Sequence, residues 1–322
     1  MNDLKKYELA IAKKTHHLLF SSRQKREGVF KNVTLIPQEL CDLSIDEIDT
    51  SVSFLDLKLD FPNYINAMTG GTPISKVINK KLALISQDFK IPVISGSMKM
   101  FLNFGDDGSF KSLKKAYKPI VNLSARESVD DLKKCAEYLD TNYASIHLNT
   151  GQELANSFGD RNFKGEIKNI KDAVKYFGDN LIVKAVGQGM SSETIKKLVD
   201  AGVKNVDISG FGGTNFTKIE SSFNRENPDF FPFISTEESL KNLTNFNVYK
   251  IASGGIDTPL DMVKAIYSGA DITASAHYYL MQTNKRMDKA YSDISRDRMN
   301  FKLIMLALGK KNTHELKGAN ND

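Results

Sequence analysis

The 322-residue sequence contains no tryptophan, only two cysteines and no long apolar segment. Cys41 and Cys135 are too few for a disulfide framework, and Cys135 falls on an apolar helix face, so both are predicted to be reduced thiols of a cytoplasmic protein. No segment approaches the roughly 18 apolar residues of a membrane-spanning helix. Residues 1–6 lack the apolar core of a signal peptide. We therefore expect neither membrane insertion nor secretion.

The sequence also lacks a strong excess of either charge. Its 44 basic and 39 acidic residues give a net charge of +5. This mild positive charge suits an anionic small molecule, and no arginine-rich arm or interleaved aromatic stripe indicates nucleic acid as a partner. There is no Ser/His/Asp order, CxxC or HExxH motif, so nucleophilic hydrolysis and a zinc site are unsupported.

From about residue 61 onward, apolar strand segments alternate with amphipathic helices, several of which begin at capping residues such as Thr72, Ser128 and Thr258. The predicted strands are Tyr64–Met68, Ile91–Ser95, Pro119–Leu123, Tyr143–Leu148, Leu181–Val186, Asn205–Ser209, Val248–Ala252 and Asp271–Ser275. Largely apolar strands that alternate with helices imply a parallel sheet buried on both faces. We predict an α/β fold, a closed TIM (β/α)8 barrel over residues 61–318 with an N-terminal extension over residues 1–60. A doubly wound open sheet is the alternative.

Small and polar residues follow nearly every predicted strand. The stretch Val206–Phe216 is the strongest example, with several glycines placed between Ser209 and Thr214. Glycines allow backbone N–H groups to approach a ligand closely, and successive N–H groups form an anion-binding concavity. Ile251–Gly255 is a close parallel. In a barrel these strand ends converge on one mouth, where the active site and a phosphate site belong, although a tight turn would also explain each glycine pair.

The densest polar cluster is His147–Glu153, which places an imidazole, two amides and a carboxylate within seven residues. Such a set suits a diphosphate, a divalent cation and a substrate carbon, since Mg²⁺ often uses only one or two carboxylates with waters and phosphates. A helix start capped by Asn149 is the alternative. Lys184 is the one charged residue in an apolar strand, and a buried lysine is costly unless paired with an anion. Lys13–His17 is a basic run that also fits a solvated helix face.

Five motifs together resemble the type 2 isopentenyl-diphosphate isomerase family, whose members are FMN-dependent barrels. They are Asn66–Gly71, His147–Glu153, Val183–Ser191, Ser209–Phe216 and Ala252–Gly255, within a resemblance that spans roughly residues 13–316. The resemblance implies conversion of isopentenyl diphosphate to dimethylallyl diphosphate in isoprenoid biosynthesis, with reduced FMN as acid/base and no net redox change. It also implies Mg²⁺, NADPH as the flavin reductant, and a homo-oligomer, either a tetramer or an octamer.

The resemblance also implies a role for each matching residue. The FMN-binding residues it implies are Met68, Thr69, Gly70, Ser97, Asn122, Lys184, Ser209, Thr214, Gly254, Gly255, Ser275 and Ala276. The substrate-binding residues it implies are Lys13, Lys14, His17, Lys99, His147, Asn149 and Gln152, so the extension would contribute to the substrate site. It makes Gln152 and Lys184 catalytic, with Gln152 at the allylic carbons, and makes Glu153 the Mg²⁺ ligand.

Several positions depart from the family pattern. Lysines stand at Lys13 and Lys99 where the family has arginine, and Ala185 replaces a glutamate. Lysine keeps the charge but loses the bidentate fork that suits phosphate, so the diphosphate clamp is expected to be weakened. An FMN-dependent 2-hydroxy-acid oxidoreductase and a non-catalytic FMN-binding paralogue stay open as alternatives. The oxidoreductase needs a histidine at the barrel mouth, and Phe211 stands where that histidine would be.

Overall fold

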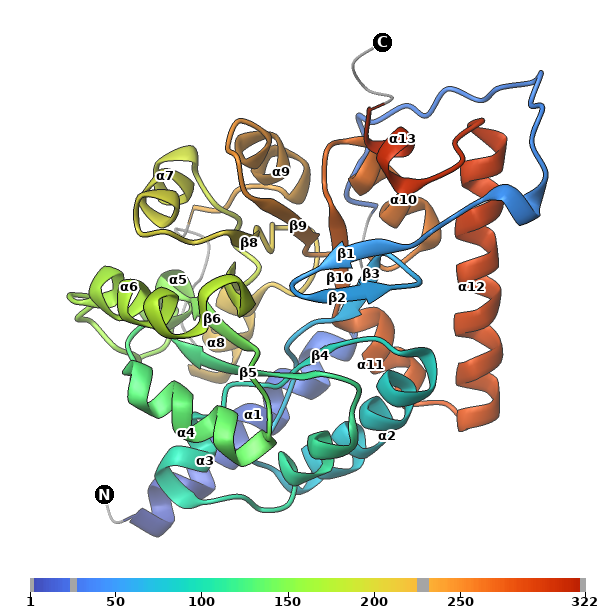
Figure 1. Cartoon of the computed structure of the whole chain (residues 1–322). Helices are drawn as coiled ribbons and strands as arrows, with labels where there is room; N and C mark the ends of the chain where they lie inside the picture. The colour runs from blue at the N-terminus through green and yellow to red at the C-terminus, as the bar shows by residue number, and fades with distance from the viewer. Residues whose placement is uncertain (1–2, 24–27, 225–231, 319–322) are drawn as a thin grey trace.

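The computed structural model describes residues 3–23, 28–224 and 232–318, and its core is a closed barrel of eight parallel strands (Figure 1). The strand order around the barrel is β10-β3-β4-β5-β6-β7-β8-β9, so neighbours in sequence are neighbours in space. The strands are β3 (Asn63–Ile65), β4 (Val93–Ile94), β5 (Pro119–Ser124), β6 (Ala144–Leu148), β7 (Leu181–Ala185), β8 (Asn205–Asp207), β9 (Tyr249–Ser253) and β10 (Ile272–Ser275). The predicted TIM barrel is confirmed, and the open-sheet alternative is wrong.

Helices cover the outside of the barrel because each buries one apolar stripe against the sheet. Those that follow the strands on the outside are α2 (Pro73–Phe89), α4 (Val129–Leu139), α6 (Glu166–Phe177), α7 (Ser192–Asp200), α9 (Thr236–Thr244) and α10 (Pro259–Tyr267). Helix α8 (Phe216–Asn224) follows β8 at the end of the barrel where the strands finish. The predicted caps are present: the side chains of Thr72, Ser128 and Thr258 each accept a backbone N–H from the first turn. The C-terminal helices are α11 (His277–Thr283), α12 (Met287–Ala307) and α13 (Thr313–Gly318).

Short elements lie in the loops at both ends of the barrel. At the end where the strands finish are α3 (Lys99–Phe104) and α5 (Thr150–Ala155). The 3₁₀ turns are η1 (Ile45–Glu47), η2 (Lys111–Lys115) and η3 (Gly178–Asn180).

The N-terminal extension contributes to both ends of the barrel. Its first helix, α1 (Asp3–Arg23), packs against α8 and α11. The antiparallel hairpin of β1 (Val52–Phe54) and β2 (Leu57–Leu59) lies at the opposite end, where Phe54 stacks on Tyr64 of β3 with ring centroids 5.0 Å apart. Residues 1–2 and 24–27 of the predicted extension lie outside the described part of the chain.

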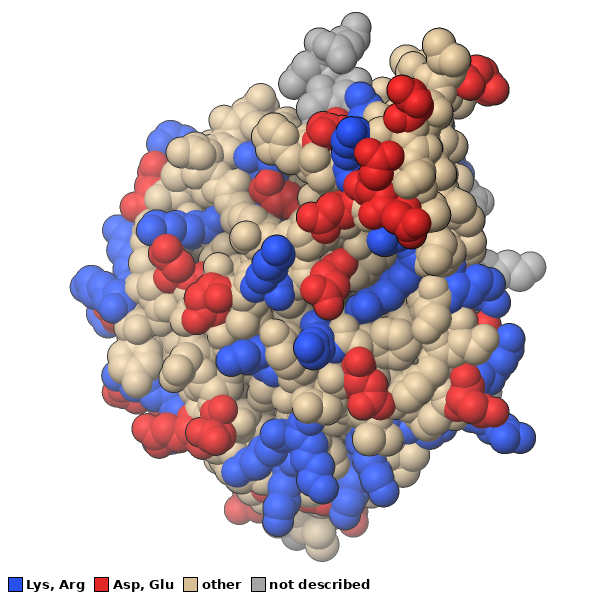
Figure 2. Space-filling view, turned by 45° about the vertical axis from the view of Figure 1, so that its right-hand side comes forward, with Lys and Arg blue, Asp and Glu red and all other residues tan. Residues whose placement is uncertain are grey.

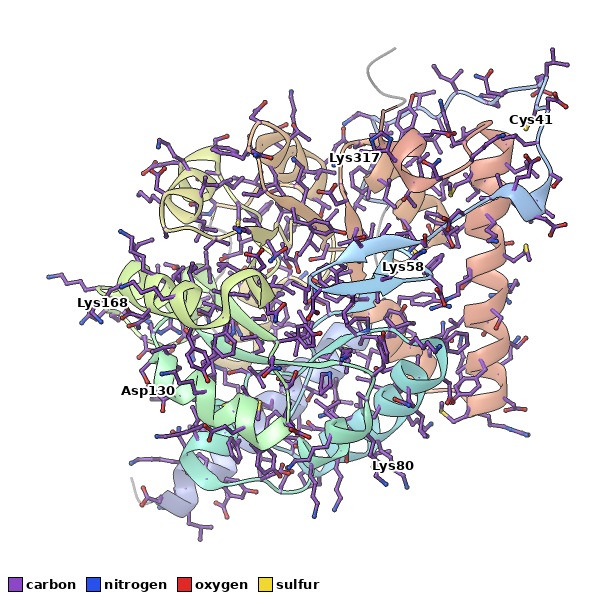
Figure 3. The ribbon with its side chains drawn as sticks, viewed as in Figure 1. Cys41, Lys58, Lys80, Asp130, Lys168 and Lys317 are labelled. Carbon is purple, nitrogen blue, oxygen red and sulfur yellow. The ribbon has the colours of Figure 1, made fainter. Side chains whose placement is uncertain are left out.

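Both cysteines are free thiols. Cys41 donates a hydrogen bond to the carbonyl of Leu306 in α12, on a segment that runs past that helix (Figure 3). Cys135 is buried in α4, and burial raises the pKa of its thiol to about 12. Within the described residues, no helix combines the length and hydrophobicity needed to cross a bilayer. Figure 2 shows one face that carries both signs of charge, with acidic side chains gathered at the upper right and basic ones toward the lower edge.

Candidate active site

A cavity of about 550 Å³ opens where the barrel strands end, and residues of α1 form part of its wall. Every site residue predicted from the sequence lines it except Gly70. Gly70 lies just behind the wall: its carbonyl accepts a hydrogen bond of 2.7 Å from Lys14 Nζ, and the ring of Phe110 packs where a side chain would be. The structure thus brings together residues from opposite ends of the sequence in one site.

The loops after β8 and β9 pack backbone against backbone at the cavity. Gly254 and Gly255 have φ angles of +100° and +82°, and a Cβ at either would lie only 2.1–2.2 Å from a carbonyl oxygen of Gly210 or Gly212. Only glycine fits such positions. Within the described residues, the backbone N–H groups of Gly254, Gly255 and Ala276 have no hydrogen-bond acceptor. Grouped free N–H donors fit an anion such as the FMN phosphate.

These three N–H donors form what we call the backbone anion cradle. Ser275 lies next to the cradle, but its hydroxyl does not take part in it. Its Oγ donates to the carbonyl of Ile256 at 2.7 Å and accepts from Asn63 Nδ2 at 3.1 Å, so the hydroxyl is engaged inside the barrel. Ser209 has a φ of 28°, an uncommon conformation for a residue with a side chain, and its Oγ accepts the N–H of Gly187.

Lys184 is buried at 5% exposure, and its Nζ donates to the carbonyl of Ala185 at 2.8 Å. Burial lowers the pKa of Lys184, and the charge of Asp207 opposes this shift. Asp207 is fully buried and accepts hydrogen bonds from Asn66 Nδ2, Tyr64 Oη and Ser253 Oγ. A lysine held in this way at the cavity wall is suited to face an anionic part of a cofactor.

His147 is held neutral at the cavity. Its Nδ1 lies 3.1 Å from Asn122 Oδ1, an acceptor, so Nδ1 carries the proton. Burial is the largest cause that lowers the pKa of His147, and together with the charges of Lys184, Arg126, Lys14 and Lys99 it brings this pKa to about 3. A diphosphate in the cavity would offset these cations and raise this pKa.

We expect the FMN-free protein to lose stability as the pH falls from about 6.5 toward 3, because His147 stays neutral in the folded state. The unfolded chain takes up this proton near pH 6.5, so in this window the free energy of unfolding falls by up to about 1.4 kcal/mol per pH unit. Urea titrations at about pH 7 and about pH 5 measure the slope. His147→Gln should remove the contribution of one proton to this slope, up to about 1.4 kcal/mol per pH unit. An unchanged slope would contradict the assignment of the titration to His147.

Three side chains converge on the buried carboxylate of Glu220 in α8. Gln152 Nε2 donates to Glu220 Oε1 at 2.9 Å, while Lys13 Nζ and His17 Nε2 lie 3.2 and 3.1 Å from the same oxygen. Burial raises the pKa of Glu220, but His17, Lys13 and Gln152 outweigh it, and the pKa lies below its ordinary value. Glu220 Oε2 has no hydrogen-bond partner in the described part of the chain. An unpaired buried carboxylate oxygen beside Gln152 is suited to accept a further hydrogen bond.

Glu153 also lies in the cavity, but its carboxylate is already engaged. Oε1 accepts from Arg126 Nη2 at 2.8 Å and from Asn149 Nδ2 at 2.9 Å, and Oε2 accepts the N–H of Asp160 at 3.0 Å. The predicted role of Glu153 as an Mg²⁺ ligand stays a prediction, and this arrangement does not fit the ion. Lys14, which also lines the cavity, donates to the carbonyls of Gly70 and Ser97, and burial lowers its pKa to about 8.

Comparison with known proteins assigns the family. Residues 111–319 match the FMN-dependent dehydrogenase family. Isopentenyl-diphosphate delta-isomerase from Bacillus licheniformis is 35% identical over 319 residues, which covers 95% of this chain and 91% of that protein. The Listeria monocytogenes serovar 1/2a protein of the same name is 32% identical, with 95% and 89% covered. The chain belongs to the type 2 isopentenyl-diphosphate delta-isomerase family. It is therefore an enzyme of an FMN-dependent family, as predicted.

More distant solved structures share the fold of this isomerase-family protein. A flavocytochrome b2 variant with bound sulfite superposes with a TM-score of 0.69 at 18% identity, covering 98% of this chain and 85% of that one. A mandelate oxidase variant with an FMN adduct gives a TM-score of 0.63 at 14% identity, with 94% and 90% covered. At such identities the likeness supports the barrel alone.

Two residues of this family member's site were missed from the sequence. Arg126 lies two residues after the end of β5, and an arginine that close to a strand end was a signal that could have been used. Glu220 lies four residues beyond the Ser209–Phe216 motif, where only its burial against α1 gives it a role. Both depend on contacts between distant segments, which local sequence patterns do not report.

Proposed function

We propose that this protein isomerises isopentenyl diphosphate to dimethylallyl diphosphate with reduced FMN bound at the barrel mouth. One observation supports it most: a single cavity is lined by the backbone anion cradle, by buried Lys184, by Gln152 and by the cations of α1. A 2-hydroxy-acid oxidase or a simple flavin carrier has no need of Gln152 and the cations of α1. The proposal includes cytoplasmic isoprenoid biosynthesis, NADPH as reductant and a homo-oligomer.

Different residues of the cavity would bind the flavin, the diphosphate and the allylic carbons. Bound reduced FMN would supply acid/base chemistry at the substrate carbons. Lys184 would offset negative charge on the flavin, and Lys13, Lys14 and His17 would hold the diphosphate. A side-chain amide is a poor acid, so Gln152 would orient the allylic carbons, while Glu220 would fix the amide by accepting its N–H at 2.9 Å.

Proton NMR of isopentenyl diphosphate in D₂O with the FMN-loaded, reduced protein tests the proposal. Conversion to dimethylallyl diphosphate with deuterium incorporation is the expected result. If the protein holds reduced FMN and no carbon exchanges, it is not an isomerase but a flavin-binding paralogue. Flavin bleaching on addition of lactate would instead identify the 2-hydroxy-acid oxidoreductase. Phe211 makes that outcome unexpected, because its ring stacks on Phe233 with centroids 3.8 Å apart and offers no base.

We expect Glu127→Gln to lower the KM for isopentenyl diphosphate by about two- to fivefold. Lys99 Nζ lies 2.9 Å from Glu127 Oε1, so this ion pair holds the ammonium away from the substrate. The Lys99 side chain is 49% exposed, and breaking such an exposed pair costs little free energy. Initial rates measure the effect. In a Lys99→Met background the same change should have no effect, and an unaltered KM in the single variant would show that Lys99 does not face the diphosphate.

A further inference from the structure

Arg126 forms an ion-pair cluster at the cavity wall that the proposed function does not use. It follows β5, and the strand end is fixed by two hydrogen bonds: the N–H of Ala125 donates to the carbonyl of His147 at 3.2 Å, and Asn169 Nδ2 donates to the carbonyl of Ala125 at 2.9 Å. Because β5 and β6 are neighbours, this segment lies beside the start of α5. Arg126 is thus held against the loop that carries the polar cluster.

The guanidinium of Arg126 is almost fully engaged by oxygen atoms. Its Nη2 donates to Glu153 Oε1 at 2.8 Å and to Asn149 Oδ1 at 3.1 Å. Nε donates to Asp160 Oδ2 at 2.8 Å, and Nη1 donates to Glu166 Oε1 at 3.3 Å. The Arg126 side chain is only 11% exposed and Glu153 only 19%. A planar guanidinium with this many partners is strongly held. Three of the partners are carboxylates, and their charge attracts the guanidinium to this position.

A magnesium ion does not fit beside this guanidinium. An ionised carboxylate offers about four lone-pair sites, and three on Glu153 already accept hydrogen bonds. Mg²⁺ binds oxygen at about 2.0–2.1 Å in a near-octahedral shell, so on Glu153 it would lie within about 5 Å of the guanidinium and be repelled by it. Across the described ranges of the chain, no group of three or more His, Cys, Asp or Glu side chains is arranged to hold a metal.

We propose that the guanidinium of Arg126 occupies the position on Glu153 that a divalent cation would take, so that this chain binds its diphosphate without magnesium. The identity of that diphosphate rests on the proposed function. Arg126 holds the side chains of Glu153 and Asn149 in their orientations at the start of α5. The counter-charge for the diphosphate then comes from side chains alone.

The charges that surround the cavity support this assignment. After burial, the groups that lower the pKa of His147 are Lys184, Arg126, Lys14 and Lys99, so four side-chain cations act on one point of the wall. Lys13 adds a fifth from α1. Lys14 donates to the carbonyls of Gly70 and Ser97. Lys13 and Lys99 are each paired with one carboxylate, which a diphosphate can displace. These three cations match the charge of a diphosphate monoester, at most about three units, without a metal.

Metal binding provides a test that does not depend on activity. Mn²⁺ is titrated into the full-length, FMN-loaded protein, and the free ion is followed by its electron paramagnetic resonance signal. We expect no stoichiometric binding to the wild type. Arg126→Gln should create one Mn²⁺ site per chain, and the double variant Arg126→Gln/Glu153→Gln should lose it, which assigns the new site to the carboxylate.

Activity provides the second test. With EDTA in place of Mg²⁺, the isomerisation rate of the wild type should change by less than about twofold, whereas Arg126→Gln should depend on Mg²⁺ by about tenfold or more. No isomerisation with either Mg²⁺ or EDTA would refute the proposed function and leave the Mn²⁺ result to decide the role of Arg126.

The proposal is overturned if the wild type binds one Mn²⁺ per chain, or loses about tenfold or more of its rate in EDTA. Both measurements use the unaltered protein, so they decide the matter even if Arg126→Gln does not fold. If Arg126→Gln folds and gains no Mn²⁺ site, Arg126 does not stand in for a cation, and that result also overturns the proposal.

Discussion

Replacing Gln152 by alanine is expected to lower kcat for isopentenyl diphosphate by about a hundredfold or more, with FMN content unchanged. Gln152 lies on α5 and donates to Glu220 Oε1 at 2.9 Å, so it connects the cavity to the carboxylate of α8. Its loss would leave the allylic carbons unoriented and Glu220 with one donor fewer. Single-turnover kinetics on the reduced protein, with FMN measured by absorbance, provide the value.

Glu220→Gln provides the control for this effect. It removes the charge but keeps the shape, and we expect a similar fall in kcat. Because both residues act through one hydrogen bond, the double variant should be slower than either single variant by only a few-fold. If the two residues acted independently, their effects on kcat would multiply. Multiplicative effects, or a normal kcat in Gln152→Ala, would contradict a shared role.

Replacing Lys184 by methionine is expected to lower the reduction potential of bound FMN by about 30–60 mV and kcat by about a hundredfold. A hydrogen bond to a charged group contributes about 1.5–3 kcal/mol, and Lys184 would make one to the reduced flavin only. Removing it therefore destabilises the reduced form more than the oxidised form. Spectroelectrochemical titration measures the potential.

A surface lysine gives the matched control for Lys184. Lys204 pairs with Asp179 at 2.8 Å and is 67% exposed, so Lys204→Met should leave both the potential and kcat unchanged. A potential that does not move in Lys184→Met would show that Lys184 is part of the barrel scaffold and does not face the flavin.

The barrel could be predicted because each strand and helix carries local signals, while the strand ends depend on specific side chains. The strand predicted at Asn205–Ser209 ends at Asp207, since Ser209 turns to a positive φ. The strand predicted at Tyr64–Met68 ends at Ile65, where Asn66 Oδ1 accepts the N–H of Ala67 and turns the chain. α5 has six residues, too few to show helical periodicity.

The composition of the site could be predicted further than its pairings. Residues at strand ends reach one mouth whatever their partners, so their part of the lining was predictable from strand positions. The part that α1 contributes, Lys13, Lys14 and His17, was predicted from the family resemblance. The ion pairs within the lining were not predictable. Arg126 and Glu153 are brought together because β5 and β6 are adjacent. Lys13 and Glu220 are brought together because α1 packs on α8. The predicted weak clamp of lysines is in fact a set of lysines partly engaged by Glu127 and Glu220.

The packing of α1 against α8 and α11 has a consequence for the newly made chain. α1 leaves the ribosome before α11, which ends at Thr283, about 260 residues later. At roughly 5–20 residues per second, α1 waits on the order of 13–50 s for its docking surface. The cations of α1 thus join the site only after α11 has been made, so the cofactor cradle and the substrate clamp mature together.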